Sequence, residues 1–505
     1  MAVAETIPDL LGLGRGDDPA LLAPGRDPLT YAALREQVAR TTAVLQARGL
    51  GRGDRVAIVL PNGPELAAAF LSIATGATAA PLNPALSAIE LEFALRDFGI
   101  RAVVVPEGSD APVRRIAASL GVAVLELRTT DARPAGWFEL ADTGEPAPPP
   151  TAPVRDDVAL VLHTSGTTAR PKIVPLRHRN LVASADHIRE TLRLGPHDRG
   201  LNIMPLFHVH GLAACLLAPL SAGGSIYCTA GFNPLRFFSE LTDARATWYS
   251  AVPTMHQAIL ARAAGNADRV AATPLRFIRS SSSALPPSVC LELESVFGVP
   301  VIQAYGMTEA AHQVASNPLP PGATQPGSVG PAAGPDVAIM DERGTLLPPR
   351  SVGEIVIRGP NVFDGYEARP TVNAESFVDG WFRTGDQGVI DAAGYLTITS
   401  RIKEIINRGG EKISPREIDE VLLEHPAVRL AVAFSVPHPL LGEDVGAAVV
   451  LKEGTEATEQ EILGFVRRRV APFKVPATLR ILAELPSSAT GKVKRLDMAR
   501  LLGLG

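Results

Sequence analysis

The chain has 505 residues, of which 46% are hydrophobic and 20% are charged, and its formal net charge is −5. These values predict a globular protein with two or three domains and no positive field to attract nucleic acid or an anionic membrane. The most apolar span, 211–228, is interrupted by proline and glycine, so it predicts a core segment and no membrane insertion. Three widely spaced cysteines and an N-terminus without a secretory signal predict a cytoplasmic protein without disulfides.

Helical and strand patterns alternate along most of the chain. The first expected elements are a helix over 31–49, a strand over 55–60, a helix over 65–75, a strand over 101–105 and a helix over 112–120. This alternation predicts an α/β fold built of layered α/β subdomains with largely parallel sheets.

The pattern changes in the later part of the chain. Short apolar runs at 336–340, 353–358 and 394–399 are separated by turn residues and predict an antiparallel β-subdomain. We therefore expect a large N-terminal domain over 1–402.

A compact βα pattern follows and predicts a small C-terminal α+β domain over 403–505. Its expected elements are a helix over 415–423 with Ser414 as N-cap, strands over 430–436 and 446–451, and a helix over 459–470.

The most informative segment is 162–176, LHTSGTTARPKIVPL, which follows an apolar run typical of a buried strand. Small hydroxyl residues and backbone N–H groups can surround a polyanion, Gly166 permits its close approach, and Lys172 supplies a charge for phosphate oxygens. Pro171 stands where a Walker loop has glycine, so the segment is not of that type. A surface loop rich in turn formers is the alternative.

Two histidines stand two residues apart in MPLFHVHGL. On a strand, His208 and His210 would share a face, which permits a metal pair. No third ligand has a matching spacing, so the sequence favours imidazoles at a pocket mouth that donate to an anion.

The segment 303–309, QAYGMTE, follows another apolar run. Tyr305 offers a flat face for a purine, Gly306 lets the backbone pass close to a ligand, and Thr308 can donate to a phosphate. Glu309 is a hard oxygen ligand suited to Mg²⁺. The alternative is a core tyrosine beside a capping acid.

Further candidates lie in the later segments. Asp386, in WFRTGD, can accept hydrogen bonds from both ribose hydroxyls, and Arg401 is a second candidate ribose contact. Lys403 would suit a hinge at the start of the small domain, and 409–410 is a glycine pair that can approach a ligand closely. Lys492 stands on a Pro/Ser/Thr/Gly loop that can carry it into a distant site. A common turn and a charged linker are the alternatives for the first two segments.

Five of these segments occur in the order and approximate spacing of the adenylate-forming superfamily, which the chain resembles over nearly its whole length. The segments are TSGTTARPK, QAYGMTE, WFRTGD, SRIKEIINRGGEKISP and PSSATGKVKR. That superfamily contains acyl-CoA synthetases, firefly luciferase and the adenylation domains of peptide synthetases. The resemblance implies that carboxylate and ATP give acyl-AMP and diphosphate, and that the thiol of coenzyme A then releases AMP.

The resemblance also implies roles for individual residues. It assigns catalysis to Lys492, Thr308, Glu309 and His208, with Glu309 on Mg²⁺. The small domain is expected to rotate about Lys403, so that Lys492 leaves and the glycine pair arrives. The residues implied in nucleotide binding are Thr164, Ser165, Gly166, Thr167, Thr168, Lys172, Ser283, Ala284, Tyr305, Gly306, Met307, Thr308, Asp386, Arg401 and Lys403.

Two positions depart from the pattern of the superfamily. Ile173 stands where these loops usually have glycine after Pro-Lys, and Asn407 stands where some relatives have a lysine used in the thiol step.

Polar residues at the positions of the acyl pocket favour a small diacid. They are His208, Arg279, Ser282 within a serine run, and His312. Together with the other motifs they resemble oxalate–CoA ligases, which implies oxalate as the acid and AMP, diphosphate and oxalyl-CoA as products. Malonate-activating relatives usually have arginine where this chain has Ala304.

Several alternatives stay open. They are malonate or another short acid, a medium-chain or aryl acid, an enzyme that loads a carrier-protein thiol, and a catalytically silent nucleotide-binding protein. The last would be expected to have lost Lys492 or Glu309, and both are present. The oligomeric state is not indicated.

Overall fold

The computed structural model describes residues 4–140, 151–164, 171–487 and 493–504. The chain packs into two compact units. The first contains Met1–Pro326, Gly330–Asp336 and Arg358–Phe377, and the second contains Gly327–Val329, Val337–Ile357 and Val378–Gly505. The domain boundary expected between residues 402 and 403 lies within the second unit and stays a prediction.

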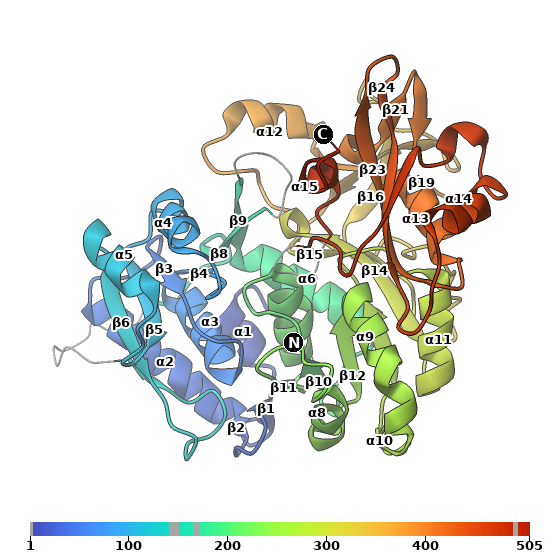
Figure 1. Cartoon of the computed structure of the whole chain (residues 1–505). Coiled ribbons are helices and arrows are strands. Elements are labelled where there is room, and N and C mark those ends of the chain that lie inside the picture. Colours follow the sequence, from blue (N-terminus) through green and yellow to red (C-terminus); the bar gives the residue numbers. More distant parts are fainter. Residues whose placement is uncertain (1–3, 141–150, 165–170, 488–492, 505) are drawn as a thin grey trace. The chain divides into compact units, whose positions relative to one another are not determined.

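A seven-stranded sheet forms one layer of the first unit (Figure 1). Its central strands are parallel, and an antiparallel strand closes each edge. The strands in spatial order are β7 (Glu139–Leu140), β6 (Ala123–Arg128), β5 (Ala102–Pro106), β3 (Arg55–Ile58), β4 (Thr78–Pro81), β8 (Val158–His163) and β9 (Ile173–Arg177).

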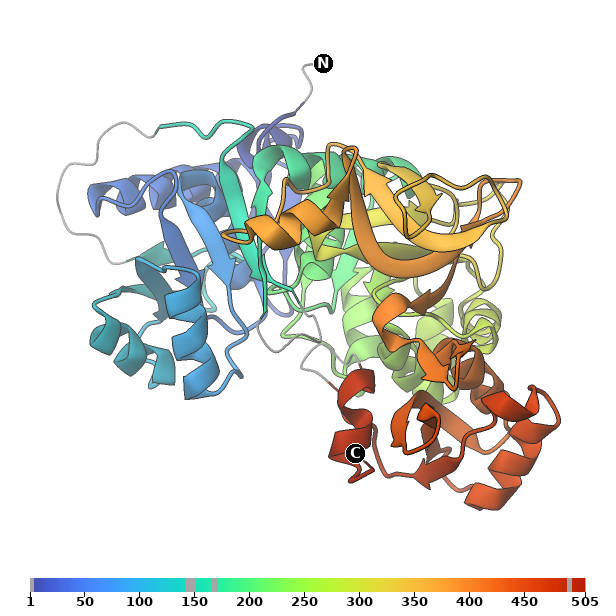
Figure 2. The ribbon, with the colours of Figure 1, turned by 90° about the horizontal axis from the view of Figure 1, so that it is seen from above.

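Helices cover both faces of this sheet (Figure 2). Two pack on one face, α2 (Tyr31–Ala47) and α3 (Pro64–Gly76), and two on the other, α4 (Ala88–Asp97) and α5 (Pro112–Leu120). The apolar faces of α4 and α5 are buried against Val103 and Val105 of β5 and the neighbouring strands. Burial of these faces is the main source of their stability, because short helices are marginal alone.

An eight-stranded, mostly parallel sheet forms the rest of the first unit. The strands in order are β15 (His312–Ser316), β14 (Val301–Met307), β13 (Phe277–Ser280), β12 (Trp248–Ala251), β10 (Arg199–Asn202), β11 (Ser225–Cys228), β1 (Pro19–Leu22) and β2 (Leu29–Thr30). The helices of this part are α1 (Ile7–Leu11), α6 (His178–Thr191), the π-helix η1 (His210–Leu217), α7 (Ala218–Ser221), α8 (Phe237–Ala244), α9 (Pro253–Ala263), α10 (Ala267–Ala271), α11 (Pro287–Phe297) and α12 (Pro370–Ser376), with short 3₁₀ turns η2 (Ala264–Asn266) and η3 (Thr308–Ala310).

The second unit contains most of a five-stranded antiparallel sheet and a second five-stranded sheet. The first sheet has the strands β16 (Asp336–Met340), β17 (Val352–Arg358), β19 (Trp381–Ile390) and β18 (Phe377–Val378), with β20 (Leu396–Arg401) beside β19. The second has β22 (Glu411–Ile413), β21 (Ile406–Arg408), β24 (Gly442–Leu451) and β23 (Val428–His438), with β25 (Thr478–Ile481) beside β24. The helices are α13 (Pro415–Leu423), α14 (Glu459–Arg467) and α15 (Met498–Leu501), with 3₁₀ turns η4 (Ile402–Glu404), η5 (Pro472–Lys474) and η6 (Arg495–Asp497).

The predicted α/β fold class is confirmed, and most expected elements lie within a few residues of their predicted bounds. Two local details differ from the patterns considered in the sequence. The histidine segment is no strand, because a turn precedes a π-helix that begins at His210. Ser414 is the N-cap residue of α13, as predicted, but its hydroxyl makes no capping hydrogen bond and donates instead to the carbonyl oxygen of Thr399.

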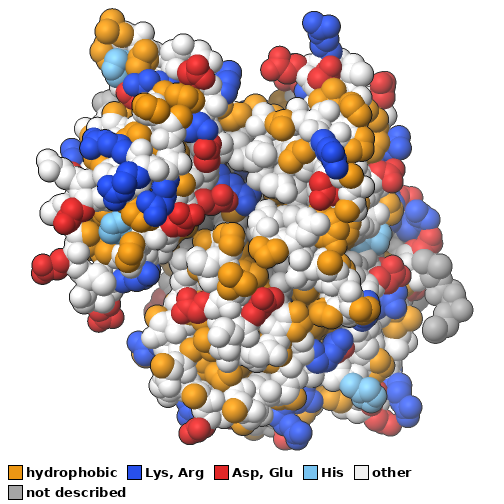
Figure 3. Space-filling view, turned by 90° about the vertical axis from the view of Figure 1, so that its right-hand side faces the viewer, with side chains coloured by type: hydrophobic (Ala, Val, Ile, Leu, Met, Phe, Trp, Pro, Cys, Tyr) orange, Lys and Arg blue, Asp and Glu red, His pale blue; other side chains and the backbone are white. Residues whose placement is uncertain are grey.

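The face of the molecule in Figure 3 carries both basic and acidic side chains. Basic and acidic side chains lie next to one another on the face that Figure 3 shows, as expected for a net charge of −5. Among the described residues, no helix is both long enough and apolar enough to cross a membrane.

Candidate functional site

The candidate phosphate loop connects two paired strands of the seven-stranded sheet, β8 and β9. At the loop's base the N–H of Thr164 donates to the carbonyl oxygen of Lys172 at 2.9 Å, and the N–H of Lys172 donates to Thr164 Oγ1 at 3.2 Å. The two ends of the loop are thereby held together. The predicted residues Ser165, Gly166, Thr167 and Thr168 lie outside the described residues.

Tyr366 joins the loop lysine to the candidate metal ligand. Lys172 Nζ lies 4.2 Å from the centroid of the Tyr366 ring, and the Tyr366 hydroxyl donates to Glu309 Oε1 at 2.7 Å. The N–H of Phe363 donates to the carbonyl oxygen of Glu309 at 2.8 Å. The structure therefore places a cation and a hard carboxylate on one aromatic ring, an arrangement suited to phosphate and its metal.

A tight hairpin carries the QAYGMTE segment. Gly306 of β14 lies so close to the carbonyl oxygen of His312 that an added Cβ would be 1.8 Å from it, so only glycine fits. Met307 pairs with His312 across the ladder, and Thr308 begins the turn η3. At the end of this turn His312 has φ = +102°, a left-handed conformation that costs free energy in a residue other than glycine.

A buried polar cluster lies where β12, β13 and η1 meet. Ser250 and Arg279 are paired across β12 and β13, and Arg279 Nη1 lies 3.3 Å from Ser250 Oγ. His210 Nε2 lies 2.7 Å from Ser250 Oγ, and His210 Nδ1 lies 3.0 Å from Ser282 Oγ. Arg279 Nη2 donates to Gln313 Oε1 at 3.4 Å.

His312 stacks on His210, with ring centroids 4.8 Å apart and planes 18° apart. Burial and the charge of Arg279 hold the pKa values of both rings well below the usual histidine value. Burial alone lowers the pKa of His208 to about 4. All three imidazoles are therefore neutral at pH 7, and within the described residues Nε2 of His208 and Nε2 of His312 are buried without a hydrogen-bond partner.

Arg279 is completely buried, and burial lowers the pKa of its guanidinium to about 10. The group stays charged at pH 7, and none of the described carboxylates forms an ion pair with it. A buried cation without an opposite charge is costly, so this end of the site is suited to an anion. Ser282, Ser283 and Ala284 follow β13 and are exposed, which leaves Ser282 between the cluster and solvent.

The candidate ribose residues lie in the second unit. Asp386 and Arg401 face each other across β19 and β20, and Arg401 Nε donates to Asp386 Oδ1 at 2.8 Å. Lys403 lies in η4, directly after Arg401. Lys492 is outside the described residues.

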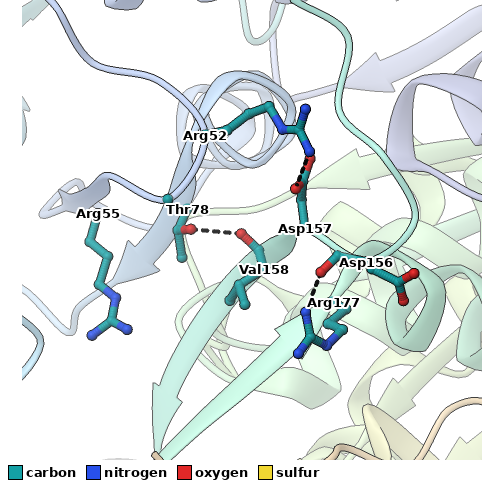
Figure 4. A pocket seen from close by; sticks show the side chains of 8 residues that line it. Arg52, Arg55, Thr78, Asp156, Asp157, Val158 and Arg177 are labelled. Atoms are coloured by element: carbon teal, nitrogen blue, oxygen red, sulfur yellow. Dashed lines mark hydrogen bonds and ion pairs between the residues drawn. The ribbon is translucent and has the colours of Figure 1, made fainter.

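An open hollow of the first unit lies elsewhere (Figure 4). It has a volume of about 560 Å³ and lies where β3, β4 and β8 begin, whereas the candidate phosphate loop follows the end of β8. Its charged groups have partners within the protein, since Arg52 pairs with Asp157 at 2.7 Å, Arg55 pairs with Glu367, and Arg177 donates to the backbone of Asp156. None of the predicted site residues lines it.

Three members of the site were not expected from the sequence. Tyr366 lies in an ordinary loop sequence, and Ser250 and Gln313 lie inside strands among apolar residues. A polar residue within an apolar strand is a weak signal that sequence reading could have used. In the part of the chain that the structure describes, no group of three His, Cys, Asp or Glu side chains is placed to hold a metal.

Known proteins are similar to this chain over most of its length. A model of the AMP-binding enzyme family matches residues 13–367, and a model of the C-terminal domain of AMP-binding enzymes matches residues 417–492. An oxalate–CoA ligase of Arabidopsis thaliana is 43% identical over 491 residues, which are 96% of this chain and 95% of that protein. An oxalate–CoA ligase of Saccharomyces cerevisiae is 41% identical over 446 residues, which are 83% of this chain and 81% of that protein.

A solved structure agrees in fold. ATP-bound MatB from Rhodopseudomonas palustris has a TM-score of 0.88 and 32% identity, over 99% of this chain and 98% of that chain. The matches cover both units and the segments that carry the candidate site. The chain therefore belongs to the family of AMP-binding enzymes and is an AMP-forming acyl-CoA ligase.

Proposed function

We propose that this ligase acts on oxalate, and that it converts oxalate, ATP and coenzyme A into oxalyl-CoA, AMP and diphosphate. The observation that carries the proposal is the completely buried Arg279, a cation that no described carboxylate neutralises, behind Ser282 and His312. A small diacid brings a second carboxylate into the site, and that carboxylate needs donors and an opposite charge once it leaves water. The likeness to oxalate–CoA ligases of two organisms supports the same substrate.

The first half-reaction activates the acid. A carboxylate oxygen attacks the α-phosphorus of ATP, the bond to the bridging oxygen breaks, and diphosphate leaves with the electron pair. The proposed phosphate ligands of the first unit are Thr164 with the following loop, Lys172 and Thr308. They act by placing donors and charge where negative charge accumulates.

Glu309 would hold a magnesium ion beside the phosphates of ATP. Its carboxylate is held by the Tyr366 hydroxyl, and Lys172 lies over the same ring. A single carboxylate is what Mg²⁺ uses beside phosphate oxygens and water, so the donor set fits the ion. When bound, Mg²⁺ neutralises phosphate charge. The protein's part is to hold the Glu309 carboxylate in a fixed orientation.

The remaining nucleotide contacts are proposed from the motifs. Tyr305, Gly306 and Met307 would lie against adenine, and Asp386 with Arg401 would hold the ribose. Ser283 and Ala284 are exposed after β13, as nucleotide contacts require. Lys403 would act as the hinge, and Lys492 would bridge the carboxylate and the α-phosphate.

The second half-reaction forms the thioester. The sulfur of coenzyme A attacks the acyl carbon, the bond from that carbon to the AMP oxygen breaks, and AMP leaves. A carboxylate alone would have to expel oxide, whereas AMP is a good leaving group. Activation by AMP is the reason for using ATP.

The acid is proposed to contact Ser282, His312 and His208. Neutral imidazoles can each donate one N–H, and Nε2 of His312 and Nε2 of His208 have no other partner among the described residues. The terminal nitrogens of Arg279 are bonded to Ser250 and Gln313, so Arg279 would act through its field and these neighbours. Malonate is one methylene longer, and selection against it would be steric and modest.

The test is the formation of AMP by purified protein with ATP, Mg²⁺ and coenzyme A, comparing oxalate, malonate and hexanoate at equal concentrations. A clear preference for oxalate supports the proposal, and His312→Ala should then lower the rate with oxalate more than the rate with hexanoate. A preference for hexanoate would contradict it, because the polar residues would not face the acyl group. Acid-dependent exchange of labelled diphosphate into ATP without coenzyme A reports the first half-reaction separately.

A further inference from the structure

A chain of hydrogen bonds connects the buried cation to the exposed serine. It runs from Arg279 through Ser250 and His210 to Ser282. Arg279 is 0% exposed and His210 is 3% exposed, whereas Ser282 is exposed. These hydrogen bonds therefore lead from the interior of the sheet to the surface at which a substrate can arrive.

The chemistry of the groups indicates which group donates and which accepts in each of these hydrogen bonds. A guanidinium only donates, and Arg279 Nη1 faces both Ser250 Oγ at 3.3 Å and His210 Nε2 at 3.5 Å. Because this donor also faces His210 Nε2, that nitrogen is best placed to accept, and the O–H of Ser250 is directed to it at 2.7 Å. Nε2 is then an acceptor and carries no proton.

The neutral His210 ring must carry its single proton on Nδ1. Nδ1–H therefore donates to Ser282 Oγ at 3.0 Å. An oxygen that already accepts this bond is best placed to donate its own hydrogen outward. Ser282 also has φ = +72°, an uncommon left-handed conformation for serine that presents its hydroxyl at the exposed end of β13.

We propose that Arg279, Ser250 and His210 are positioning residues that hold the Ser282 hydroxyl as a hydrogen-bond donor toward a carboxylate oxygen of the acid substrate. The inference deepens the proposed function, because the oxygen that accepts from Ser282 is that of the bound acid. A donor fixed before binding requires no reorientation when the acid arrives.

Two variants of His210 distinguish the roles of the two ring nitrogens. The amide nitrogen of asparagine lies near the place of Nδ1, whereas that of glutamine reaches toward the place of Nε2. His210→Asn can still donate to Ser282, and His210→Gln cannot. We expect kcat/KM for the preferred acid to fall only a few-fold in His210→Asn and roughly tenfold further in His210→Gln, the equivalent of one hydrogen bond. Equal losses, or a smaller loss in His210→Gln, would overturn the proposal, because simple filling of space favours the larger side chain.

Ser250 supplies a second test, since its hydroxyl does not reach the exposed surface. Ser250→Ala should raise KM for the acid roughly tenfold and leave KM for ATP unchanged, and Ser250→Thr, which restores a hydroxyl, should recover most of the loss. The control is Ser72→Ala, which removes another buried hydroxyl, bonded to the carbonyl oxygen of Ala68 within α3. A loss in Ser72→Ala equal to that in Ser250→Ala would overturn the specific role of Ser250.

The protonated nitrogen can be measured directly in the wild-type protein without any substrate. Nitrogen-15 NMR of histidine-labelled protein distinguishes Nδ1–H from Nε2–H, and the His210 signal is assigned by its loss in the His210 variants. Nδ1–H is expected, and Nε2–H would overturn the proposal. Because this readout needs no acid, it decides the direction of the chain even if oxalate proves not to be the substrate. The kinetic comparison then uses whichever acid gives most AMP.

Discussion

The backbone N–H of Ile7, at the start of α1, donates a buried hydrogen bond of 3.2 Å to Nδ1 of His178, the first residue of α6. The bond joins segments 171 positions apart in the sequence. Burial lowers the pKa of His178 from 6.5 to about 4, against the opposing charges of Asp157 and Asp9. A protonated ring would have no lone pair on Nδ1 with which to accept from Ile7.

This pair predicts a loss of stability in mild acid. Between pH 6.5 and 4 the unfolded state binds a proton at His178 that the folded state does not bind, so the free energy of unfolding falls as the pH falls. The contribution of this group is up to ~3 kcal/mol at its full extent. It should appear as a lower midpoint in urea denaturation at pH 5 than at pH 7.

The matched variant is His178→Asn, whose amide oxygen can still accept from Ile7 but does not titrate. We expect a lower stability at pH 7, because asparagine fills less space, and a weaker dependence on pH. The other buried histidines are unchanged, so the difference between the two proteins isolates His178. The same slope in both proteins would show that the ring is not the group responsible.

Lys492 is expected to act in the first half-reaction. Lys492→Ala should lower acid-dependent exchange of diphosphate into ATP by roughly two to three orders of magnitude, because a fixed positive charge on the transferring group is lost. Binding of ATP, measured by calorimetry, should stay close to wild type. Lys494→Ala, two residues away, is the control for altered loop charge, and its exchange rate should be unchanged. Full exchange activity in Lys492→Ala would disprove the role.

The contact between Tyr366 and Glu309 predicts a change in magnesium requirement. Tyr366→Phe removes the 2.7 Å hydrogen bond and keeps the ring beneath Lys172. We expect the Mg²⁺ concentration for half-maximal rate to rise several-fold, as the carboxylate loses its fixed orientation. Glu309→Gln should have a much larger effect, since it removes the ligand charge. If Tyr366→Phe changes KM for the acid and not the Mg²⁺ dependence, Glu309 is not the metal ligand.

The sequence predicts the fold class well because the signals for it are local. Helix 112–120 coincides with its predicted bounds because proline starts it and glycine ends it in a left-handed conformation. The buried polar cluster was harder to anticipate. His210, Ser250 and Gln313 come from three elements, and nothing local to any of them indicates that the fold brings them together around one arginine.

The π-helix shows a second limit of sequence reading. Apolar residues surround His208 and His210, and a run of this kind is compatible with a strand or a buried helix. Packing decides for η1, where Gly211 lies so close to Pro205 that an added Cβ would be 2.2 Å from its carbonyl oxygen. Gly211 and Pro205 are near in sequence, but their contact depends on the conformation of the intervening backbone. The periodicity of apolar residues does not indicate that conformation.

The sequence predicts that Gly306 is glycine because the backbone passes close to a ligand there. The structure gives a different reason, which lies within the protein. A Cβ at this position would lie 1.8 Å from the carbonyl oxygen of His312, which is backbone and cannot rotate away. Gly306→Ala should therefore separate β14 from β15 and destabilise the protein by several kcal/mol, at the upper end of the range for point mutants.

The matched control is Gly265→Ala in η2, where an added Cβ meets no atom within 4 Å. This variant should melt within a degree or two of wild type, because a methyl group in open space changes little. Gly306→Ala should melt far lower and should also lose AMP formation, since the hairpin carries Glu309 and His312. If Gly306→Ala melts with the control but loses activity, the glycine serves the ligand and not the hairpin, as the sequence alone suggested.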